Sequence, residues 1–375
     1  MQPTRVNWIL ACCLVWIGQS CDAEAADEAV TIYPTYGYQK DGQWLIPMRL
    51  WVHERRTVAE LGAKKLAAEI SDASPREILN FRSRIVNFLA DSESREEVHL
   101  EFDRDPDQQQ IQLKDSDNHV LRSDLNGLIE GQITLTQERA EALLEAQESS
   151  NGWLSISVTS KGHIGKGRVQ LIEPEGLSVI SDIDDTIKVT EIPAGPEVVV
   201  RNTLLRDYKA APGMAAKYNK WSGAAFHYVS GGPWQMYDPL FEFLINAEQG
   251  FPEGSFHMKS VPRNLFSTSS WKELKQLITN SEHTYDHKVA EITLLMQRFP
   301  QRQFILVGDS GEKDPEVYRA VQEKFRQQVR EIWIRDIVND RDQNPSRLAM
   351  MNVIPATTIK RGVSEFDSEQ PAPPK

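Results

Sequence analysis

The hydrophobic pattern of the C-terminal half alternates between two periods. From about residue 175, short apolar runs are followed by segments in which apolar residues recur every three or four positions. The runs favour buried strands, and the recurring spacing favours amphipathic helices. Because strands that alternate with helices are typical of a parallel sheet, residues 175–345 are predicted to form an α/β domain. The predicted strands, of which the fifth is expected to be the last, are Leu177–Ser181, Ala224–Val229, Phe256–Lys259, Phe304–Val307 and Glu331–Ile334.

Helices are predicted between these strands. Lys288–Phe299 has a clear apolar stripe at helical period. In the final helix Pro315 suits the first turn, and Asp314 is the expected N-cap. The predicted helices are Gly213–Trp221, Met236–Ala247, Trp271–Thr279, Lys288–Phe299 and Pro315–Gln327.

Residues 26–174 are rich in alternating, strand-like runs and contain no evident catalytic set. We therefore predict a β-rich accessory domain, with a module that recognises a substrate or a surface as the alternative. The predicted strands are Ala29–Tyr38, Trp44–His53, Val98–Phe102, Gln109–Leu113, Gly131–Leu135, Trp153–Val158 and Gly167–Leu171. The predicted helices are Thr57–Ile70, Pro75–Leu89 with Ser74 as N-cap, and Thr136–Gln147 capped by Thr136.

The two ends of the chain have the composition of processing and tail segments. Residues 1–25 are predicted to be a signal peptide, with an apolar stretch at Trp8–Gly18 that is too short to span a bilayer. We therefore expect a secreted or periplasmic protein, with lipid attachment at Cys21 as the alternative. Residues 346–375 are predicted to be a partly disordered tail.

Composition narrows the classes of function. The cysteines are Cys12, Cys13 and Cys21, so removal of residues 1–25 would leave no thiol for catalysis or metal binding. The net charge of −12, with 26% charged residues, argues against non-specific nucleic-acid binding and against a strongly basic membrane surface. No nucleic-acid or protein partner is predicted.

Candidate chemistry lies where the predicted strands end. Asp182, Asp184 and Asp185 follow the first strand, with Thr186 directly after them. Clustered carboxylates at the end of a buried strand are costly unless a cation compensates their charge. Three further segments stand at comparable places: Ser230-Gly231-Gly232, the lysine Lys288, and the run from Gly308 to Pro315.

These residues fit phosphoryl transfer. Asp182, first after the strand, is the candidate nucleophile, and Asp184 is the candidate acid and base. Lys288 would neutralise the nucleophile and the transferring group. Mg²⁺ is the expected cofactor, because it prefers oxygen ligands and bridges phosphate to carboxylate. Its predicted ligands are Asp182, the backbone carbonyl of Asp184, Asp309 and Asp314.

Thr186, Ser230 and Gly231 are the candidate substrate-binding residues, and the glycines at 231, 232, 308 and 311 would let the backbone approach a phosphate or turn sharply. Asp185 has no assigned role and is expected to be solvated or to cap a helix.

Other polar residues have more ordinary interpretations. His283 and His287 have the spacing of zinc ligands but no evident third ligand, so we expect surface or capping histidines. His227 is expected in the core. Trp234 is expected to pack and to form part of the active-site wall, with contact to a membrane as the alternative. Lys259 and Arg263 are secondary candidates for phosphate contacts.

The ordered set of motifs resembles the catalytic domain of the actin-patch-associated phosphatidate phosphatase family. The matching segments are SDIDDTIK at Ser181, LRDYKAAPGM at Leu205, YVSGGPWQMYDPL at Tyr228, Lys288, GDSGEKDPEVY at Gly308 and WIRDI at Trp333. One departure is Gly231-Gly232, where many members have an Asn-Ser pair.

The resemblance implies a haloacid dehalogenase-like fold, shared with the lipins, and Mg²⁺-dependent hydrolysis of phosphatidate to diacylglycerol and phosphate through an aspartyl-phosphate. Two alternatives stay open: a phospholipid-binding module without turnover, and a phosphatase for a soluble phosphomonoester.

Overall fold

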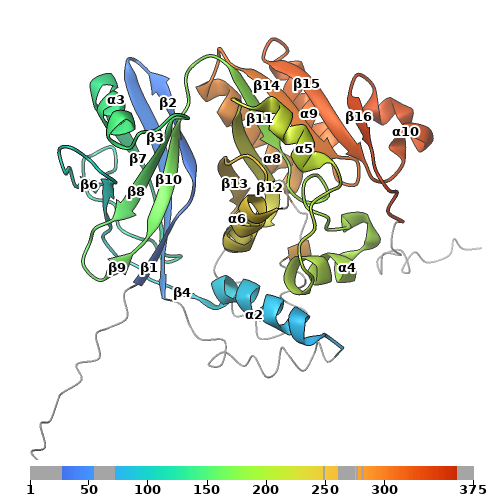
Figure 1. Cartoon of the computed structure of the whole chain (residues 1–375), viewed down its shortest axis with the longest axis horizontal. Coiled ribbons are helices and arrows are strands. Elements are labelled where there is room, and N and C mark those ends of the chain that lie inside the picture. Colours follow the sequence, from blue (N-terminus) through green and yellow to red (C-terminus); the bar gives the residue numbers. More distant parts are fainter. Residues whose placement is uncertain are drawn as a thin grey trace, which may run out of the picture.

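The computed structural model describes residues 28–54, 72–247, 250–260, 275, 278–279 and 283–360. The predicted signal peptide, the helix at Thr57–Ile70, most of Trp271–Thr279, Arg263 and the tail from residue 361 therefore lie outside the described residues. In the described ranges, no helix is both long and apolar enough to cross a membrane. Figure 1 shows a β-rich N-terminal body beside an α/β C-terminal body.

The C-terminal body is built on six parallel strands in the order β13-β12-β11-β14-β15-β16, which confirms the predicted parallel sheet. The strands β11 to β14 are almost wholly buried, as expected for a sheet covered on both faces. Their bounds are β11 Leu177–Ser181, β12 Ala225–Pro233, β13 Ser255–Lys259, β14 Gln303–Asp309, β15 Val329–Asp336 and β16 Asn352–Pro355.

This strand order brings the motifs that follow β11 and β14 to neighbouring positions at one edge of the sheet. After β11 the chain adds β12 and β13 on one side, and then returns to add β14 on the other side of β11. The carboxyl ends of β11 and β14 therefore flank the place where the strand order reverses. Open α/β sheets bind their ligands at such a switch point.

Helices cover both faces of this sheet (Figure 1). Helix α8 begins at Thr284, one turn before the predicted start, so Lys288 lies in its second turn. In α9 the N-cap is Lys313, and Asp314 is the first helical residue, contrary to the predicted cap. The helices are α4 Pro196–Val200, followed by a π-helical turn at Arg201–Leu205, α5 Met214–Tyr218, α6 Tyr237–Asn246, α8 Thr284–Arg298, α9 Asp314–Lys324 and α10 Asp340–Gln343.

The prediction that the fifth strand is the last was wrong. Residues 352–355 form β16, which pairs in parallel with β15, so regular structure continues beyond 345. This strand is short and only half-buried, and its sequence carries a weak apolar signal.

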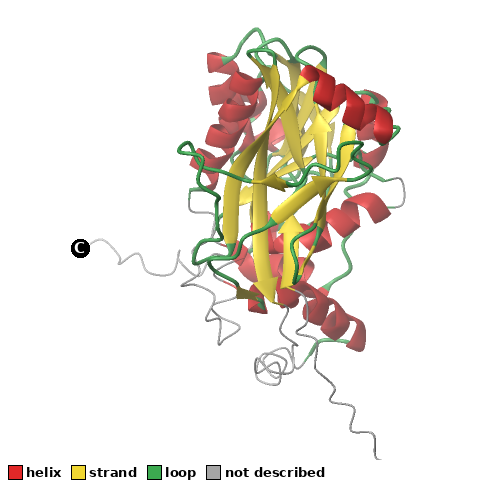
Figure 2. Cartoon of the chain, turned by 90° about the vertical axis from the view of Figure 1, so that its left-hand side faces the viewer, coloured by secondary structure: helices red, strands yellow, loops and turns green. Residues whose placement is uncertain are grey.

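The N-terminal body is a ten-stranded sheet that encloses its own core, and Figure 2 looks onto it. The predicted strand Ala29–Tyr38 is two strands, because Tyr33 and Pro34 interrupt it and proline has no N–H to donate. Helix α3 Gln137–Ala146 is capped by the Thr136 hydroxyl, as predicted. The strands are β1 Glu28–Ile32, β2 Thr35–Lys40, β3 Gln43–Glu54, β4 Asp91–Ser92, β5 His99–Phe102, β6 Ile111–Gln112, β7 Leu128–Thr136, β8 Trp153–Val158, β9 His163–Ile164 and β10 Lys166–Leu171.

Helix α2, Pro75–Leu89, belongs to the N-terminal region but packs on the C-terminal body (Figure 1). Its predicted Ser74 cap is present as a full capping box with Glu77. The Arg84 guanidinium donates to the carbonyl oxygens of Thr203, at 3.2 Å, and of Arg206, at 2.7 Å. The helix thus braces the π-helical turn, which forms part of the pocket described below.

A buried guanidinium fixes the junction between the two bodies. Arg302 donates to the carbonyl oxygens of Glu173, at 2.7 Å, and of Glu175 and Leu177, and to Ser178 Oγ at 2.9 Å. Burial lowers the pKa of Arg302 to about 10, which leaves it charged at neutral pH. One side chain therefore provides hydrogen-bond donors for several backbone carbonyl groups at and just before the start of β11.

We expect Arg302→Met to destabilise the protein by about 3 kcal/mol, because buried carbonyl groups lose their donors. Urea denaturation measures this. Arg326→Met, at an exposed position, is the matched control and should change the free energy of unfolding by less than about 0.5 kcal/mol. Equal stability of the two variants would show that the junction does not depend on Arg302.

Candidate active site

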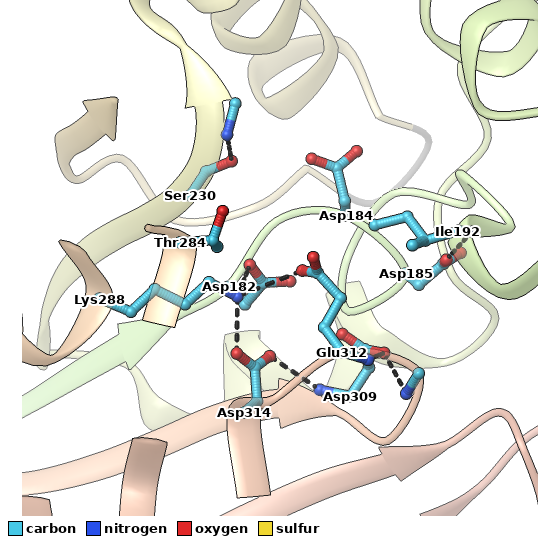
Figure 3. Close-up of polar contacts among 12 residues, drawn as sticks. Asp182, Asp184, Asp185, Ile192, Ser230, Thr284, Lys288, Asp309, Glu312 and Asp314 are labelled. Carbon is cyan, nitrogen blue, oxygen red and sulfur yellow. Dashed lines mark hydrogen bonds and ion pairs between the residues drawn. The ribbon is translucent and has the colours of Figure 1, made fainter. Parts of the chain in front are cut away.

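The centre of the site is an ion pair between two fully buried side chains (Figure 3). Asp182 follows β11 directly and is 1% exposed, and Lys288 comes from α8 with its side chain 2% exposed. Lys288 Nζ lies 2.8 Å from Asp182 Oδ1 and 2.6 Å from Asp314 Oδ1. The structure thus brings together the candidate nucleophile, the candidate lysine and a candidate metal ligand, each from a different element.

Carboxylates outnumber the lysine here. Glu312 Oε2 lies 3.4 Å from Lys288 Nζ, and Asp309 is fully buried beside Asp314. Burial raises the pKa of Asp182, and the charges of Asp314 and Glu312 add to this rise although Lys288 opposes it. Burial and the charges of Asp314 and Asp182 likewise raise the pKa of Asp309. The cluster therefore lacks positive charge.

A divalent cation would supply the positive charge that the cluster lacks. Asp182, Asp309 and Asp314 each offer a carboxylate oxygen, and these oxygens lie within 4.8 Å of one another. Asp182 Oδ2 and Asp309 Oδ2 are buried and have no hydrogen-bond partner among the described residues. Hard oxygen ligands of this kind suit Mg²⁺. The Asp184 carboxylate lies outside the group, and its predicted contribution, a backbone carbonyl, stays a prediction.

Asp184 has a cationic partner that the sequence analysis did not assign. Its Oδ1 lies 2.8 Å from Nζ of the buried Lys188 and accepts from Thr190 Oγ1 at 2.5 Å. Burial alone would raise the pKa of Asp184, but the charge and the hydrogen bond of Lys188 outweigh it and lower this pKa. The two aspartates of the motif thus have opposite pKa shifts.

Asp185 is not solvated, so that expectation was wrong, whereas its carboxylate does accept from the first N–H of the 3-10 helix Ile192–Ala194. It is fully buried in the left-handed region at φ 56°. Its carboxylate accepts from the backbone N–H groups of Thr190, Glu191 and Ile192, at 2.9, 2.7 and 2.6 Å. Arg335 Nη1 donates to the Asp185 carbonyl at 2.6 Å. Asp185 therefore fixes the loop that follows the motif.

The loop after β14 is fixed in a similar way. Asp309 Oδ1 accepts from the backbone N–H of Gly311 at 2.7 Å, and Ser310 Oγ donates to Asp336 Oδ1 at 2.9 Å. A side chain at Gly308 would put its Cβ 2.4 Å from Asp314 Oδ2. The end of β15, with Arg335 and Asp336, thus supports both catalytic loops.

The predicted substrate-binding residues lie close by but differ in their surroundings. Ser230 is buried within β12, which runs on to Pro233, and its Oγ accepts from the Gly232 N–H at 3.0 Å. Thr186 is buried, and its Oγ1 has no partner within the described ranges. A Cβ at Gly231 would lie 2.6 Å from Thr284 Cγ2. Glycines 231, 232, 308 and 311 all lack a positive φ, and close packing explains 231, 308 and 311.

A pocket opens beside the cluster and is lined by both polar and apolar residues. The polar lining includes Asp184, Lys188, Thr190, Thr284 and Glu312. The apolar lining includes Ile192, Val199, Pro233, Met236, Leu240 and Ile278. Such a pocket suits a ligand with an anionic and an apolar part.

The remaining sequence candidates have structural roles. His227 is fully buried, with Nδ1 2.8 Å from Ser255 Oγ, and burial holds its pKa well below 6.5, which confirms a core histidine. His283 is exposed at the N-cap position of α8, and no potential metal cluster of described residues includes it or His287. Lys259 donates to Thr284 Oγ1 at 3.3 Å.

Trp234 packs on Tyr33 of the N-terminal body, with ring centroids 4.4 Å apart. The packing expected of Trp234 is therefore present, but Pro233 and Met236 form the pocket wall instead.

Glu312 and Lys188 were the functional candidates that sequence reasoning missed. Glu312 stands inside the matched GDSGEKDPEVY segment, and Lys188 lies four residues after Asp184. The short spacing between Asp184 and Lys188 was the available signal, although such pairs are common on protein surfaces.

We expect Asp185→Asn to lower the free energy of unfolding by about 2 kcal/mol, because an amide group replaces one oxygen that accepts backbone N–H groups. Chemical denaturation measures the loss. Asp342→Asn makes the same change at an exposed position and should have little effect. A normal stability for Asp185→Asn would contradict the anchoring role.

The part of the chain that is similar to known proteins contains this carboxylate cluster. Residues 177–336 match the family model described as the catalytic domain of phosphatidate phosphatase APP1. Phosphatidate phosphatase APP1 of Saccharomyces cerevisiae is 33% identical over 180 residues, which cover 47% of this chain and 28% of that protein. An uncharacterised protein of Schizosaccharomyces pombe is 28% identical over 178 residues, or 46% and 27% of the two chains.

The matched region therefore spans little more than a quarter of either fungal relative. It includes β11, β12, β14, β15 and every residue of the carboxylate cluster. Residues 177–336 of this chain are thus similar to the catalytic domain of phosphatidate phosphatase APP1.

Proposed function

We propose that this protein is a Mg²⁺-dependent phosphatase that hydrolyses phosphatidate through an aspartyl-phosphate on Asp182. The observation that carries the proposal is the buried cluster of Asp182, Lys288, Asp309 and Asp314, in which two carboxylate oxygens have no partner among the described residues. A bound Mg²⁺ would supply positive charge that stabilises the transferring phosphoryl group.

In the first step, Asp182 Oδ2 attacks phosphorus while Lys288 holds Oδ1. The bond between phosphorus and the ester oxygen breaks, and Asp184 gives its proton to the leaving alkoxide. The pKa of Asp184 is lowered by Lys188, which also lines the pocket. A substrate phosphate competes with Asp184 for this lysine, and the competition raises the pKa of Asp184 towards that of an acid.

In the second step, Asp184 takes a proton from water, and the water oxygen attacks the phosphorus of the aspartyl-phosphate. The bond to Asp182 Oδ2 breaks, phosphate leaves, and Asp182 returns as a carboxylate. Asp184 ends the cycle with the proton that it lost in the first step, so one water molecule is consumed for each ester cleaved.

The pocket supports a lipid substrate. Its lining combines the apolar side chains of Ile192, Val199, Met236 and Leu240 with polar and charged ones, as a glycerolipid with an anionic head requires. The name of the yeast relative points to phosphatidate. We further propose that the predicted signal peptide directs the enzyme to a secreted or periplasmic location, where it contacts membranes that contain its substrate.

We expect Asp182→Asn to lower the rate of phosphate release from phosphatidate vesicles by at least about 10³-fold, because an amide is not a nucleophile. Asp342→Asn is the matched control and should retain full activity. A panel of phosphatidate, sugar phosphates and nucleotides, ranked by kcat/KM, identifies the substrate class. A ranking led by soluble esters would replace the lipid, whereas vesicle binding without turnover on any ester would indicate a lipid-binding module.

We expect chelation to abolish phosphate release and Mg²⁺ to restore it. Because burial raises the pKa of Asp182 and of Asp309, Mg²⁺ binding at these residues should also release protons. Calorimetric titration in buffers of different ionisation enthalpy measures this release. Asp309→Asn should lose both the binding heat and the rise in Tm caused by Mg²⁺, and retention of both would contradict the ligand assignment.

A further inference from the structure

A second group of potential ligands lies in the N-terminal body, far along the chain from the catalytic motifs. It consists of Glu28 at the start of β1, Glu96 in the segment before β5, and His163 at the start of β9. In Figure 1, β1 and β9 lie side by side at the lower end of that body, and the two strands pair with Glu28 directly opposite His163. Three separate segments thus bring two carboxylates and one imidazole together.

The histidine is buried but incompletely satisfied. Its side chain is 7% exposed, and Nε2 has no hydrogen-bond partner among the described residues. Nε2 lies 3.2 Å from Glu28 Oε2 and 3.4 Å from Glu96 Oε2, so both carboxylates are within ion-pair distance of the ring. Glu28 Oε2 is also buried without a hydrogen-bond partner in the described ranges. The His163 Nε2 and Glu28 Oε2 atoms, neither of which has a hydrogen-bond partner within the described residues, therefore lie next to each other.

These separations match the edges of a metal coordination shell. In a tetrahedral site with bonds of about 2.0 Å, neighbouring ligand atoms lie roughly 3.3 Å apart. The other ring nitrogen, Nδ1, lies 3.0 Å from Ser160 Oγ. A ligating histidine usually makes such a bond through its second nitrogen, which fixes the tautomer and the ring orientation.

The surrounding backbone holds the three residues in place. The Glu28 N–H donates to the Gly162 carbonyl at 2.8 Å, and the Glu96 N–H donates to Ser123 Oγ at 2.8 Å. The site is thus organised in advance of binding.

We propose that Glu28, Glu96 and His163 bind a divalent transition-metal ion, of which Zn²⁺ is the best fit. An imidazole nitrogen with two carboxylates suits Zn²⁺ and its neighbours in the series, whereas Mg²⁺ and Ca²⁺ prefer all-oxygen sites such as the aspartate cluster. Three protein ligands leave a fourth position for water. The ion would tie β1 and β9 to the segment before β5.

Co²⁺ is a suitable probe, because its visible absorption is stronger in a tetrahedral site with a nitrogen ligand than in an octahedral all-oxygen site. The full-length protein is freed of metal and titrated with Co²⁺, while absorption and bound equivalents are measured, and Zn²⁺ is then added as competitor. We expect His163→Gln to lose one bound equivalent and the tetrahedral spectrum, or to bind that equivalent at least tenfold more weakly.

His283→Gln is the matched control, because His283 is exposed and belongs to no potential metal cluster of described residues, so this change should leave Co²⁺ uptake unchanged. Glu96→Gln, at a half-exposed position, should repeat the loss and provides the test if His163→Gln does not fold. If the wild type binds no more Co²⁺ than these two variants, the proposal is wrong, and His163 is then a protonated partner of two carboxylates.

Discussion

The C-terminal body depends on the packing of one buried lysine against several buried carboxylates. Removing an ion from water costs several kcal/mol, and Lys288 compensates only part of that cost for Asp182, Asp314 and Glu312. The deficit appears as raised pKa values for Asp182 and Asp309. A cation bound among these carboxylates would offset their repulsion, and it would link the stability of the cluster to its chemistry.

Much of the remaining structure holds these charges at fixed positions. Asp185 accepts three backbone N–H groups and so fixes one loop, while Asp336 and Arg335 support that loop and the one after β14. Helix α2, contributed by the N-terminal region, braces the turn that carries Thr203 into the pocket wall. The β-rich region thus takes part in shaping the site, and the two bodies are coupled through α2 as well as through Arg302.

The sequence predicted the helices and strands that local patterns determine. It did not predict the contacts between residues that lie far apart in the chain. Apolar runs that end in carboxylates indicated β11 and β14, and the fixed geometry of parallel strands brought those ends together. Nothing near Asp185 indicates that its carboxylate would anchor the following loop, or that Arg335, 150 positions later, would bind its carbonyl. The weak pattern of β16 likewise becomes a strand only because β15 offers a free edge. Long-range contacts override local propensity at such places.

Asp182 and Asp184 stand two residues apart, yet their partners shift their pKa values in opposite directions. These shifts are the reverse of what the proposed chemistry needs, since the nucleophile should be ionised and the acid protonated. A cation beside Asp182 and Asp309 would lower the pKa of the nucleophile, and a phosphate that attracts Lys188 would raise the pKa of Asp184. Under the proposed mechanism, cation and substrate would therefore together favour the protonation states that the reaction needs.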